Sequence, residues 1–547
     1  MRWRYDGVKV CPAGADRSGS VGRFCGAYRS PCCVRADIGR KICSDILSVM
    51  KILTGSRIRE ADRYTIAREP IDSIALMERA SESIAQWVAG HVRPECPLAF
   101  FVGKGNNGGD GLAVARMLHR AGFSCAVYLA FGRDELSEEC RFNLERLPRG
   151  LPVRPMAEAS LPEGTVIVDA LLGTGVRGEL TEPLLGAVRR INSSGCRVVS
   201  IDLPSGMFSE FGNAGRTTVR ATTTLTLEFP KLALLLPEGG EAAGEVVVLP
   251  IGLSEEYMDR AESLYFYTDA AAAARLPLSR PKFAHKGNCG HALLVCGSED
   301  MAGAAVLATG AALRSGCGLV TVHLPRSERV SVHANSSSAI VSGDPEPVFS
   351  RLPRDMGRYD AVGVGPGVGQ DPRSFEALEA LLRAGLPAVI DADALNMLSA
   401  RTELQRLVAR GSILTPHLGE LRRLAGDWAS EDEKIEKTRD LASRLGCCVV
   451  VKGAHTMVCS SDGRCFFNSS GNPGMAKGGS GDVLTGFLAG LLARGYEPLA
   501  AAILGVYLHG RAGDRAADYY GQEAMNAGDL IDFLSEAQQE ILGRDNG

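Results

Sequence analysis

The stretch LAFFVGKGNNGGDGLAVARMLH (residues 98–119) decides the fold of the first half of this chain. Its first five residues are apolar and predict a buried strand, while the apolar spacing of residues 112–119 predicts a helix. The segment GNNGGDG (residues 105–111) holds four glycines, which let backbone amides approach a phosphate at the start of a helix. A strand that turns through glycines into a helix predicts a Rossmann-like, doubly wound α/β domain.

The same order of strand, polar loop and helix recurs further along the chain. Strands are predicted over residues 165–169, 197–202, 223–229 and 245–249. The first two run into DALLGTG (169–175) and DLPSG (202–206). Ligands of doubly wound domains bind beyond the carboxyl ends of the strands, so we expect the functional residues in these loops. One such loop could be a plain tight turn, but three at successive strand ends indicate a binding site, distinct from the dinucleotide motif G-x-G-x-x-G.

Composition limits the classes of function. The 547 residues carry 60 basic and 64 acidic side chains, so the formal net charge of −4 gives no general reason to expect nucleic acid or a membrane surface as a partner. No apolar run approaches the roughly 20 residues that span a bilayer. The 16 cysteines show no CxxC pair and no zinc-type spacing, which indicates reduced structural thiols. We therefore expect a cytoplasmic α/β enzyme of two or three large domains.

Residues 1–49 differ in character from the rest. They hold nine basic and four acidic residues, follow neither helical nor strand periodicity, and lack the apolar region of a signal peptide. We interpret them as a disordered extension or an over-called start, with a transit peptide as the alternative. The sequence MKILTGSRIREADRYTI (residues 50–66) then predicts a short strand and an amphipathic helix. The expected domains are residues 50–260 and 281–547, joined by a linker over residues 261–280.

The second half continues the α/β alternation. Strands are predicted over residues 291–296 and 318–324, with a helix over residues 303–314 between them. The turn Ser461-Asp462-Gly463 predicts a hairpin within residues 449–467, because Asp-Gly favours tight β-turns. Polar or glycine-rich loops again follow strands, namely GPGVG (365–369), DADALN (391–396) and TPHLGE (415–420). These features predict a second, larger α/β domain.

The segment GNPGMAKGGSGDVLTG (residues 471–486) carries the strongest chemical signal. Residues 478–481 precede a helix that runs to about residue 493, so free backbone amides can hold a transferring phosphoryl group. Asp482 in the first turn could accept a proton from an attacking hydroxyl, or could simply be an acid that the helix dipole favours. The sequence contains no G-x-x-x-x-G-K-[ST], which excludes a P-loop NTPase.

The motifs GNNGGDG, DALLGTG and DLPSG follow a helix that ends in LMERA (76–80), and together they resemble the NAD(P)H-hydrate epimerase family over about residues 50–260. Members of that family interconvert the R and S forms of nicotinamide nucleotides hydrated at C6. The resemblance implies that Asp202 faces the nicotinamide ring as a catalytic residue, and that Asn107, Asp169 and Ser205 bind K⁺. It assigns to the hydrated nucleotide Asn106, Asn107, Gly108, Gly109, Asp110, Gly173, Thr174, Gly175, Val176, Arg177, Gly178, Glu179 and Asp202.

In the second half, a glycine-rich anion site followed by aspartate resembles the ribokinase-like fold. Within it, GSEDMAGA (297–304), GPGVG, DADALN, TPHLGE, KGAHT (452–456) and GNPGMAKGGSGD resemble the ADP/ATP-dependent NAD(P)H-hydrate dehydratases over about residues 275–540. The resemblance assigns to the hydrated dinucleotide Ala304, Gly367, His417 and the catalytic Asp482. It assigns to ADP Lys452, Gly453, Ala454, His455, Thr456, Gly471, Asn472, Pro473, Gly474, Met475, Ala476, Lys477, Gly478, Gly479, Ser480 and Gly481. By analogy with the fold alone, Glu420 is expected to help hold Mg²⁺ through water.

Two positions depart from the pattern of the dehydratases. Leu418 stands where that family usually has proline, and Lys477 stands where a small residue or threonine is common. Lys477 could add a charge near the nucleotide phosphates or point into solvent, and the sequence does not decide between the two.

Together the resemblances imply a bifunctional repair enzyme. It would epimerise R- and S-NAD(P)HX and dehydrate S-NAD(P)HX with ADP, preferred over ATP, releasing AMP and phosphate. Its expected partners are the small molecules NADHX, NADPHX and ADP, with K⁺ and Mg²⁺ as cofactors, and a homo-oligomer stays open. Two other functions also stay open: a ribokinase-like small-molecule kinase fused to a nucleotide-binding domain, and a non-catalytic scaffolding role for the first domain.

Overall fold

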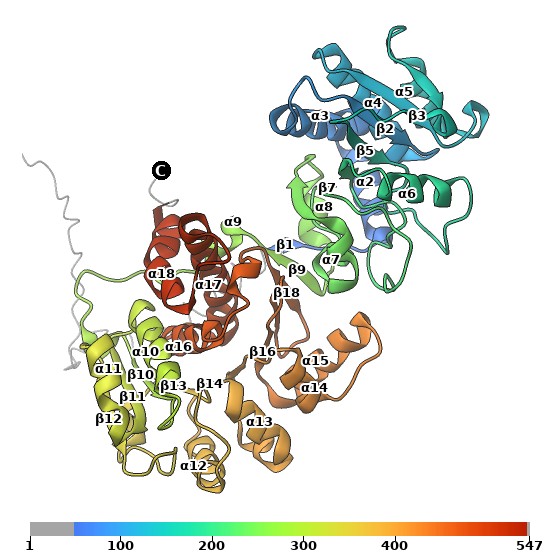
Figure 1. Ribbon diagram of the computed structural model, residues 1–547. Coiled ribbons are helices and arrows are strands. Elements are labelled where there is room, and N and C mark those ends of the chain that lie inside the picture. Colours follow the sequence, from blue (N-terminus) through green and yellow to red (C-terminus); the bar gives the residue numbers. More distant parts are fainter. Residues whose placement is uncertain (1–48, 544–547) are drawn as a thin grey trace, which may run out of the picture.

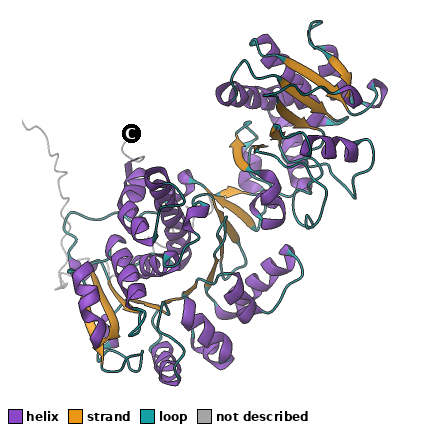
Figure 2. Cartoon of the chain, viewed as in Figure 1, coloured by secondary structure: helices purple, strands orange, loops and turns teal. Residues whose placement is uncertain are grey.

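The computed structural model describes residues 49–543 and contains two α/β units (Figures 1 and 2). The first unit has a seven-stranded sheet in which all neighbouring strands are parallel. Its order is β4 (Val153–Pro155), β3 (Cys125–Leu129), β2 (Leu98–Val102), β5 (Val166–Ala170), β6 (Arg197–Ile201), β7 (Thr223–Leu227) and β8 (Glu245–Leu249). The predictions made for residues 1–49 lie, apart from Val49, outside the described residues.

Alternating side chains of the central strands build an apolar core on each face of the first sheet. Phe100 packs in one cluster with Ile84 of α3 (Ser73–His91) and Leu112 of α4 (Asn106–Arg120). Phe101 packs in another with Ile191 of α6 (Leu184–Asn192). The remaining helices of this unit are α2 (Gly55–Arg68), α5 (Glu138–Glu145), α7 (Pro237–Ala243) and α8 (Glu255–Arg260), with a 3₁₀ turn η3 (Leu232–Leu235). This two-faced arrangement confirms the doubly wound α/β class.

The second unit has an eleven-stranded sheet among the described residues. Its order is β1 (Met50–Lys51), β9 (Tyr265–Thr268), β18 (Cys465–Asn468), β17 (Met457–Cys459), β16 (Cys448–Val451), β15 (Ile413–Leu414), β14 (Ala388–Ile390), β13 (Ala361–Val364), β10 (His291–Val295), β11 (Leu319–Pro325) and β12 (Ile340–Asp344). From β16 to β12 every neighbouring pair is parallel. Antiparallel pairing of β17 with β18 confirms the predicted hairpin.

Helices cover both faces of this second sheet (Figure 1). One face carries α10 (Ala302–Arg314), α16 (Ser480–Ala493), α17 (Pro498–Tyr520) and α18 (Ala527–Leu542). The other carries α12 (Pro372–Arg383), α13 (Ala392–Ala400), α14 (Leu418–Ala425) and α15 (Glu431–Leu445). Two shorter helices are α9 (Ala270–Ala273) and α11 (Arg329–Asn335). The neighbouring strand residues Val389 and Ile390 point into the two separate apolar clusters, which confirms a second α/β domain.

The two units are interlocked. Strand β1 precedes the first unit in the chain but pairs antiparallel with β9, with Met50 opposite Tyr267. Ile52 is buried in the same apolar cluster as Leu235 of η3 and Phe467 of β18. The segment 261–280, expected as a linker, contributes β9 and α9, and β9 is a strand of the second sheet. The boundary between the units therefore runs through shared apolar contacts.

Two local features differ from the sequence-based expectation. Helix α4 begins at Asn106, so GNNGGDG forms its first turns and not an open loop before residue 112. The glycines permit close packing, because a Cβ on Gly108 would lie 2.2 Å from the Gly103 carbonyl oxygen and one on Gly111 would lie 2.4 Å from the Ala170 Cβ. Strands β3 and β4 were not predicted, because the short apolar run of β3 is flanked by no motif and β4 has only three residues, one of them an arginine.

Two expectations drawn from the composition can be compared with the structure of residues 49–543. The described cysteines are free and mostly buried, as expected of structural thiols. No helix in this part of the chain is long and apolar enough to cross a membrane.

Replacing Ile52 by alanine tests the interlock. Because Ile52 is 1% exposed in the core of the second unit, we expect Ile52→Ala to lower the free energy of unfolding by about 2–5 kcal/mol, measured by urea denaturation. Ile340→Ala is the matched control, since Ile340 is 39% exposed and should cost much less. Equal losses of unfolding free energy in the two variants would contradict the burial of Ile52 in an apolar core shared by the two units.

Candidate functional sites

The first candidate site lies at the carboxyl ends of β5 and β6, where Asp169 is fully buried. Its carboxylate accepts hydrogen bonds from the Ser200 hydroxyl at 2.8 Å, the Ser205 amide at 2.9 Å and the Ser205 hydroxyl at 2.6 Å. Burial raises the pKa of Asp169, and these hydrogen bonds act in the opposite direction. The structure thus brings together two of the three residues predicted to bind K⁺.

Asn107, the third of them, lies in the first turn of α4 at the same edge of the sheet. A Cβ on Gly173 would lie 3.3 Å from the Asp202 Oδ2 and 3.5 Å from the Asn107 Oδ1, so both side chains border this glycine. The Asn107 Nδ2 is buried, and no hydrogen-bond partner for it is found among the described residues. Asn107, Gly173 and Asp202 therefore meet in one place, as predicted for the nucleotide site.

Asp202 is paired with a buried cation that the sequence interpretation missed. The Lys231 Nζ lies 2.5 Å from the Asp202 Oδ1, and the Lys231 side chain is 2% exposed. Two further acids lie in this neighbourhood: burial raises the pKa of Asp62 to about 6 and holds the pKa of Asp110 well above its ordinary value. A lysine inside the apolar run FPKLALLL (229–236) was the available signal for this cluster.

The predicted segment 173–179 is anchored by a second residue that the sequence interpretation missed. Arg216 forms an ion pair with Glu179 at 2.9 Å and donates a hydrogen bond to the Gly178 carbonyl at 2.6 Å. Its guanidinium also stacks over the ring of Phe208 at 3.7 Å. Arg216 therefore holds the far end of this loop in place.

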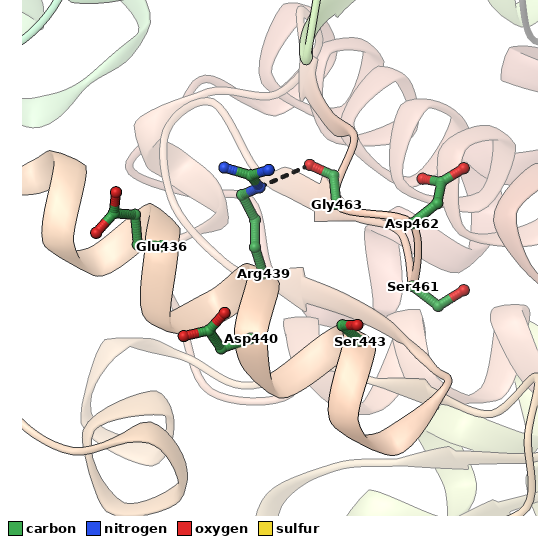
Figure 3. A pocket seen from close by; sticks show the side chains of 7 residues that line it. All are labelled: Glu436, Arg439, Asp440, Ser443, Ser461, Asp462 and Gly463. Atoms are coloured by element: carbon green, nitrogen blue, oxygen red, sulfur yellow. Dashed lines mark hydrogen bonds between the residues drawn. The ribbon is translucent and has the colours of Figure 1, made fainter.

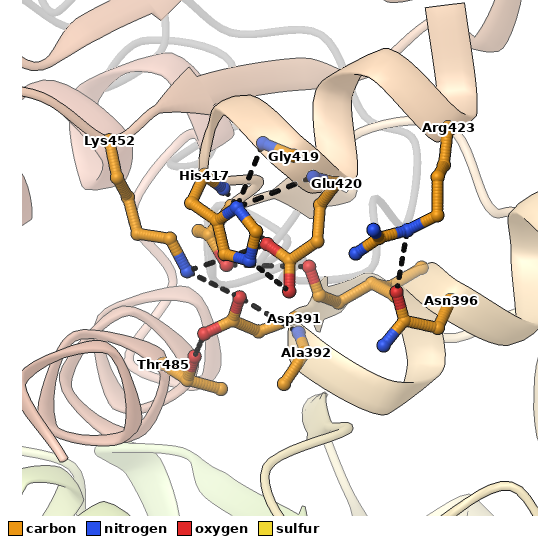
Figure 4. A network of polar contacts seen from close by, with 11 residues as sticks. Asp391, Ala392, Asn396, His417, Gly419, Glu420, Arg423, Lys452 and Thr485 are labelled. Carbon is orange, nitrogen blue, oxygen red and sulfur yellow. Dashed lines mark hydrogen bonds and ion pairs between the residues drawn. The ribbon is translucent and has the colours of Figure 1, made fainter. Parts of the chain in front are cut away.

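The second candidate site is a network around Asp391, at the carboxyl end of β14 (Figure 4). Its carboxylate accepts hydrogen bonds from the Lys452 ammonium at 2.7 Å, the Thr485 hydroxyl at 2.8 Å and the Ala392 amide at 2.9 Å. Asp391 is 1% exposed, and Lys452 also lies 3.9 Å from Glu420. The network thus joins residues that follow β14 and β16 to helix α16. The sequence motif DADALN contains Asp391 but did not predict a role for it.

Asp482 lies in the first turn of α16, as predicted, next to this network. Burial, with Asp391 and Asp393 nearby, raises the pKa of Asp482 to about 6, and Lys452 acts against that shift. Gly481 borders the network, because a Cβ on it would lie 3.4 Å from both the Asp391 Oδ2 and the Lys452 Nζ. A helix N-terminus, a lysine and a carboxylate with a raised pKa can together bind an anion and accept a proton.

Two contacts fix the glycine-rich segment that leads into α16. The Asp514 carboxylate accepts hydrogen bonds at 3.1 Å from the Gly471 amide and from the Asn472 side chain. Buried His509 contacts the Ser480 carbonyl through its Nε2 at 3.0 Å, and burial lowers the pKa of His509 to about 4, so its ring is neutral. Both residues lie on α17 and were missed by the sequence interpretation.

The ammonium of Lys477 is held by two backbone carbonyls. Its ammonium donates hydrogen bonds at 2.6 Å to the carbonyls of Glu523 and Met525, which precede α18. It thus anchors the glycine-rich segment to the connection between α17 and α18.

The remaining predicted dehydratase residues fall into two groups. Gly367 and Ala304 are neighbours, because a Cβ on Gly367 would lie 3.1 Å from the Ala304 Cβ. His417 caps α14, where its Nδ1 accepts from the Gly419 amide at 2.9 Å and its own amide donates to Glu420 at 2.8 Å. Burial raises the pKa of Glu420.

The KGAHT segment borders a cavity of about 440 Å³ where the two units meet. Lys452, Gly453, Ala454 and His455 line one side, and residues 234–237 of the first unit line the other. Half-buried His455 contacts the Asn468 carbonyl through its Nδ1 at 2.9 Å.

A second hollow, of about 490 Å³, lies between α15 and the turn of the β17–β18 hairpin (Figure 3). There the Arg439 Nε donates to the Gly463 carbonyl at 2.9 Å. This hollow is lined by none of the predicted site residues.

Within residues 49–543, no group of three or more histidine, cysteine, aspartate or glutamate side chains is arranged to hold a metal ion.

Gly479 tests the geometry at the start of α16. It has a φ of +97°, and an added Cβ would lie 2.6 Å from the Leu307 Cδ1. We expect Gly479→Ala to lower the free energy of unfolding by at least about 1 kcal/mol, measured by urea denaturation. Gly478→Ala is the matched control, since a Cβ there meets open space and should cost nothing. If the control loses as much stability as Gly479→Ala, the strain argument is wrong.

Comparison with known proteins gives matches to both units. A family model described as NAD(P)H-hydrate dehydratase matches residues 292–536, and one described as YjeF-related protein N-terminus matches residues 73–233. The chain is 35% identical over 509 residues to the bifunctional NAD(P)H-hydrate repair enzyme Nnr of Moorella thermoacetica, covering 89% of this chain and 96% of that protein. It is 34% identical over 499 residues to the protein of the same name from Coxiella burnetii, covering 89% and 99%.

Among solved structures, the chain is similar to the ADP/ATP-dependent NAD(P)H-hydrate dehydratase of Bacillus subtilis co-crystallised with ATP/Mg²⁺. The two are 30% identical with a TM-score of 0.45, and the match covers 50% of this chain and 97% of that one.

Proposed function

The chain belongs to the family of bifunctional NAD(P)H-hydrate repair enzymes, and on that premise we propose a division of labour between its two sites. The first site epimerises R- and S-NAD(P)HX. The second dehydrates S-NAD(P)HX with ADP, releasing AMP and phosphate. The observation that carries the proposal is Asp482, which stands in the first turn of α16, next to Gly481 and the Asp391–Lys452 pair.

The proposed dehydration begins with phosphoryl transfer, because hydroxide is a poor leaving group. The Asp482 carboxylate takes the proton of the C6 hydroxyl as that oxygen attacks the terminal phosphorus of ADP, and AMP leaves. The backbone amides of residues 478–481 stabilise the charge on the transferring phosphoryl group. The lone pair of the ring nitrogen then expels phosphate, and loss of a proton from C5 restores the dihydropyridine.

Around this centre we assign the other predicted residues by position. Ala304, Gly367 and His417 would hold the hydrated dinucleotide, while residues 452–456 and 471–481 would hold ADP. Mg²⁺ neutralises nucleotide phosphates when it is bound. Glu420 is suited to a position near Mg²⁺. Burial raises the pKa of this carboxyl group, and a nearby cation would favour its charged form.

For the first site we propose that Asp202 faces the nicotinamide ring, with residues 106–110 and 173–179 around the nucleotide. K⁺ suits the residues present: Asp169 supplies one buried charge, Ser205 a hydroxyl oxygen and Asn107 an amide. The buried Asn107 Nδ2, which has no hydrogen-bond partner among the described residues, is a donor and so supports an acceptor group of the nucleotide at this point, while the Asn107 Oδ1 is the atom that could bind the cation. A single charged ligand favours a monovalent cation over Mg²⁺.

We propose that this enzyme works in the cytoplasm on small molecules, NADHX and NADPHX, with residues 50–260 and 281–547 as its two catalytic domains. The free, mostly buried cysteines of residues 49–543 suit a reducing compartment.

Asp482 provides the test of the proposed function. We expect Asp482→Ala to lower the dehydration rate by about 10²–10⁴-fold while ADP binding stays largely unchanged, because backbone amides hold the phosphate. The rate is measured as the return of dihydronicotinamide absorbance from mixed hydrates with ADP or ATP. Since Asp482 must be ionised to act and its pKa is about 6, the wild-type rate should fall as the pH falls through about 6.

Asp202→Asn is the reciprocal control for this experiment. It should abolish epimerisation and leave dehydration of the S-epimer near normal, whereas Asp482→Ala should leave epimerisation intact. More than a tenth of wild-type dehydration in Asp482→Ala at saturating ADP would remove this residue from the mechanism. ADP consumption that yields a stable phosphate ester, with no regain of absorbance, would favour a small-molecule kinase.

The cation can be tested by crystallography. We expect a crystal grown with KCl to contain a non-water peak within coordination distance of Asn107, Asp169 and Ser205, and Asp169→Asn to weaken it because the single charge is lost. Soaking in RbCl supplies the control through anomalous scattering at the same position. Octahedral ligands at about 2.1 Å would identify Mg²⁺ and contradict the assignment.

A further inference from the structure

Lys231 is a fully buried ammonium at the first site, and no role has been given to it so far. Its side chain is 2% exposed, and its Nζ contacts the Asp202 Oδ1 at 2.5 Å and donates to the Leu227 carbonyl at 2.9 Å. The ring of Phe229 lies 5.2 Å from the same nitrogen. Burying a lysine costs several kcal/mol unless its charge is compensated, so this position calls for a physical reason.

The backbone holds both partners of this ion pair in fixed places. Asp202 follows β6 with a left-handed φ of +66°, and its amide donates to the Leu225 carbonyl of β7 at 2.8 Å. Lys231 is four residues beyond β7 and leads directly into η3, whose Leu232 and Leu235 pack in the core of the second unit. A non-glycine residue in the left-handed region costs about 1–3 kcal/mol and persists only where its surroundings fix it.

The charges around Lys231 come from three other elements. Asp202 follows β6, Asp62 lies on α2 and Asp110 lies on α4. All three carboxyl groups interact electrostatically in this cluster, and the ammonium of Lys231 acts against the charge repulsion at Asp62. Of these three carboxyl groups, Asp202 is the one that forms an ion pair with the Lys231 ammonium.

The chemistry of epimerisation needs such a carboxylate. To invert C6, its bond to the hydroxyl oxygen breaks, the ring nitrogen supplies the electron pair, and the leaving oxygen takes up a proton to become water. Water then adds to the opposite face of C6 and gives up one proton, so protons and electrons balance over the cycle. An ionised carboxylate near the ring can accept that proton.

We propose that Lys231 is a positioning residue for epimerisation, whose buried ammonium holds the Asp202 carboxylate in place at the end of β6 so that it can take the proton of the adding water. This inference rests on the proposed function of the first site. Lys231 acts through Asp202, and no contact between Lys231 and the nucleotide is required.

The test compares Lys231→Met, which removes the charge, with Lys231→Arg, which keeps it. The readout is interconversion of resolved R and S hydrates between pH 5 and 9, and each preparation is checked by its dehydration of the S-epimer. We expect Lys231→Met to lower the epimerisation kcat at least about 10²-fold at pH 7. The loss should appear in kcat with KM nearly unchanged, because Lys231 acts through Asp202 and does not contact the nucleotide. Lys231→Arg should retain at least a tenth of the wild-type rate, because it keeps the positive charge.

Lys434→Met is the matched control. Lys434 is another buried lysine that pairs with an acid, Glu431, but it lies on α15 in the second unit. The Lys434→Met variant should lose about as much stability as Lys231→Met, while its epimerisation rate stays within twofold of wild type. If Lys231→Met does not fold, Lys231→Gln replaces it with the same expected loss in kcat, because glutamine keeps a polar side chain at this position without the charge.

The outcomes separate this inference from the proposed function. A wild-type protein that does not interconvert the hydrates would overturn both. An active wild type with more than a third of its rate left in Lys231→Met, or with a loss of rate that Lys231→Arg shares in full, would overturn only the role of Lys231 and make it a structural residue.

Discussion

An ion pair between a buried aspartate and a lysine stands at each of the two sites, with Lys231 fully buried and Lys452 half-buried, and the arrangement of both sites depends on it. Asp202 meets Lys231 at 2.5 Å, and Asp391 meets Lys452 at 2.7 Å. Each partner follows a different strand, so neither charge is compensated until those strands have assembled in the correct order. Because an uncompensated buried charge costs several kcal/mol, the pairs penalise misassembled sheets as well as placing the reactive carboxylates.

Parallel strands bring the rest of each site to the same edge. Asp169 at the end of β5 reaches Ser205 beyond β6, and Thr485 of α16 reaches Asp391 beyond β14. Glycine permits the close approach this requires, since a Cβ on Gly108 would fall 2.2 Å from a backbone oxygen. Two different reactions on the same hydrated nucleotides can thus share one topological rule, with ligands bound beyond the carboxyl ends of the strands.

The sequence predicted most of what local patterns encode. The strand–glycine–helix unit at residues 98–119, the hairpin turn at residues 461–463 and Asp482 in the first turn of α16 all have local signals. The partners of the buried charges do not, because Asp202 and Lys231 are 29 residues apart, and Asp391 and Lys452 are 61 residues apart. Only the strand order makes them neighbours. The role of Lys477 could not be predicted from the sequence for the same reason. The carbonyls of Glu523 and Met525, to which its ammonium donates, lie far along the chain in the connection between α17 and α18.

The interlock of the two units gives the fusion a physical consequence beyond joining two activities. Lys231 belongs to the first site, and the next residue, Leu232, is already in the apolar core of the second unit. Opening the segment around η3 would separate the Lys231–Asp202 pair and also expose Leu232 and Leu235, each worth about 1.5–3 kcal/mol of burial. The position of the Lys231 ammonium at the epimerase site therefore depends partly on the folding of the dehydratase unit. A first domain on its own would need other contacts in place of those that Leu232 and Leu235 make.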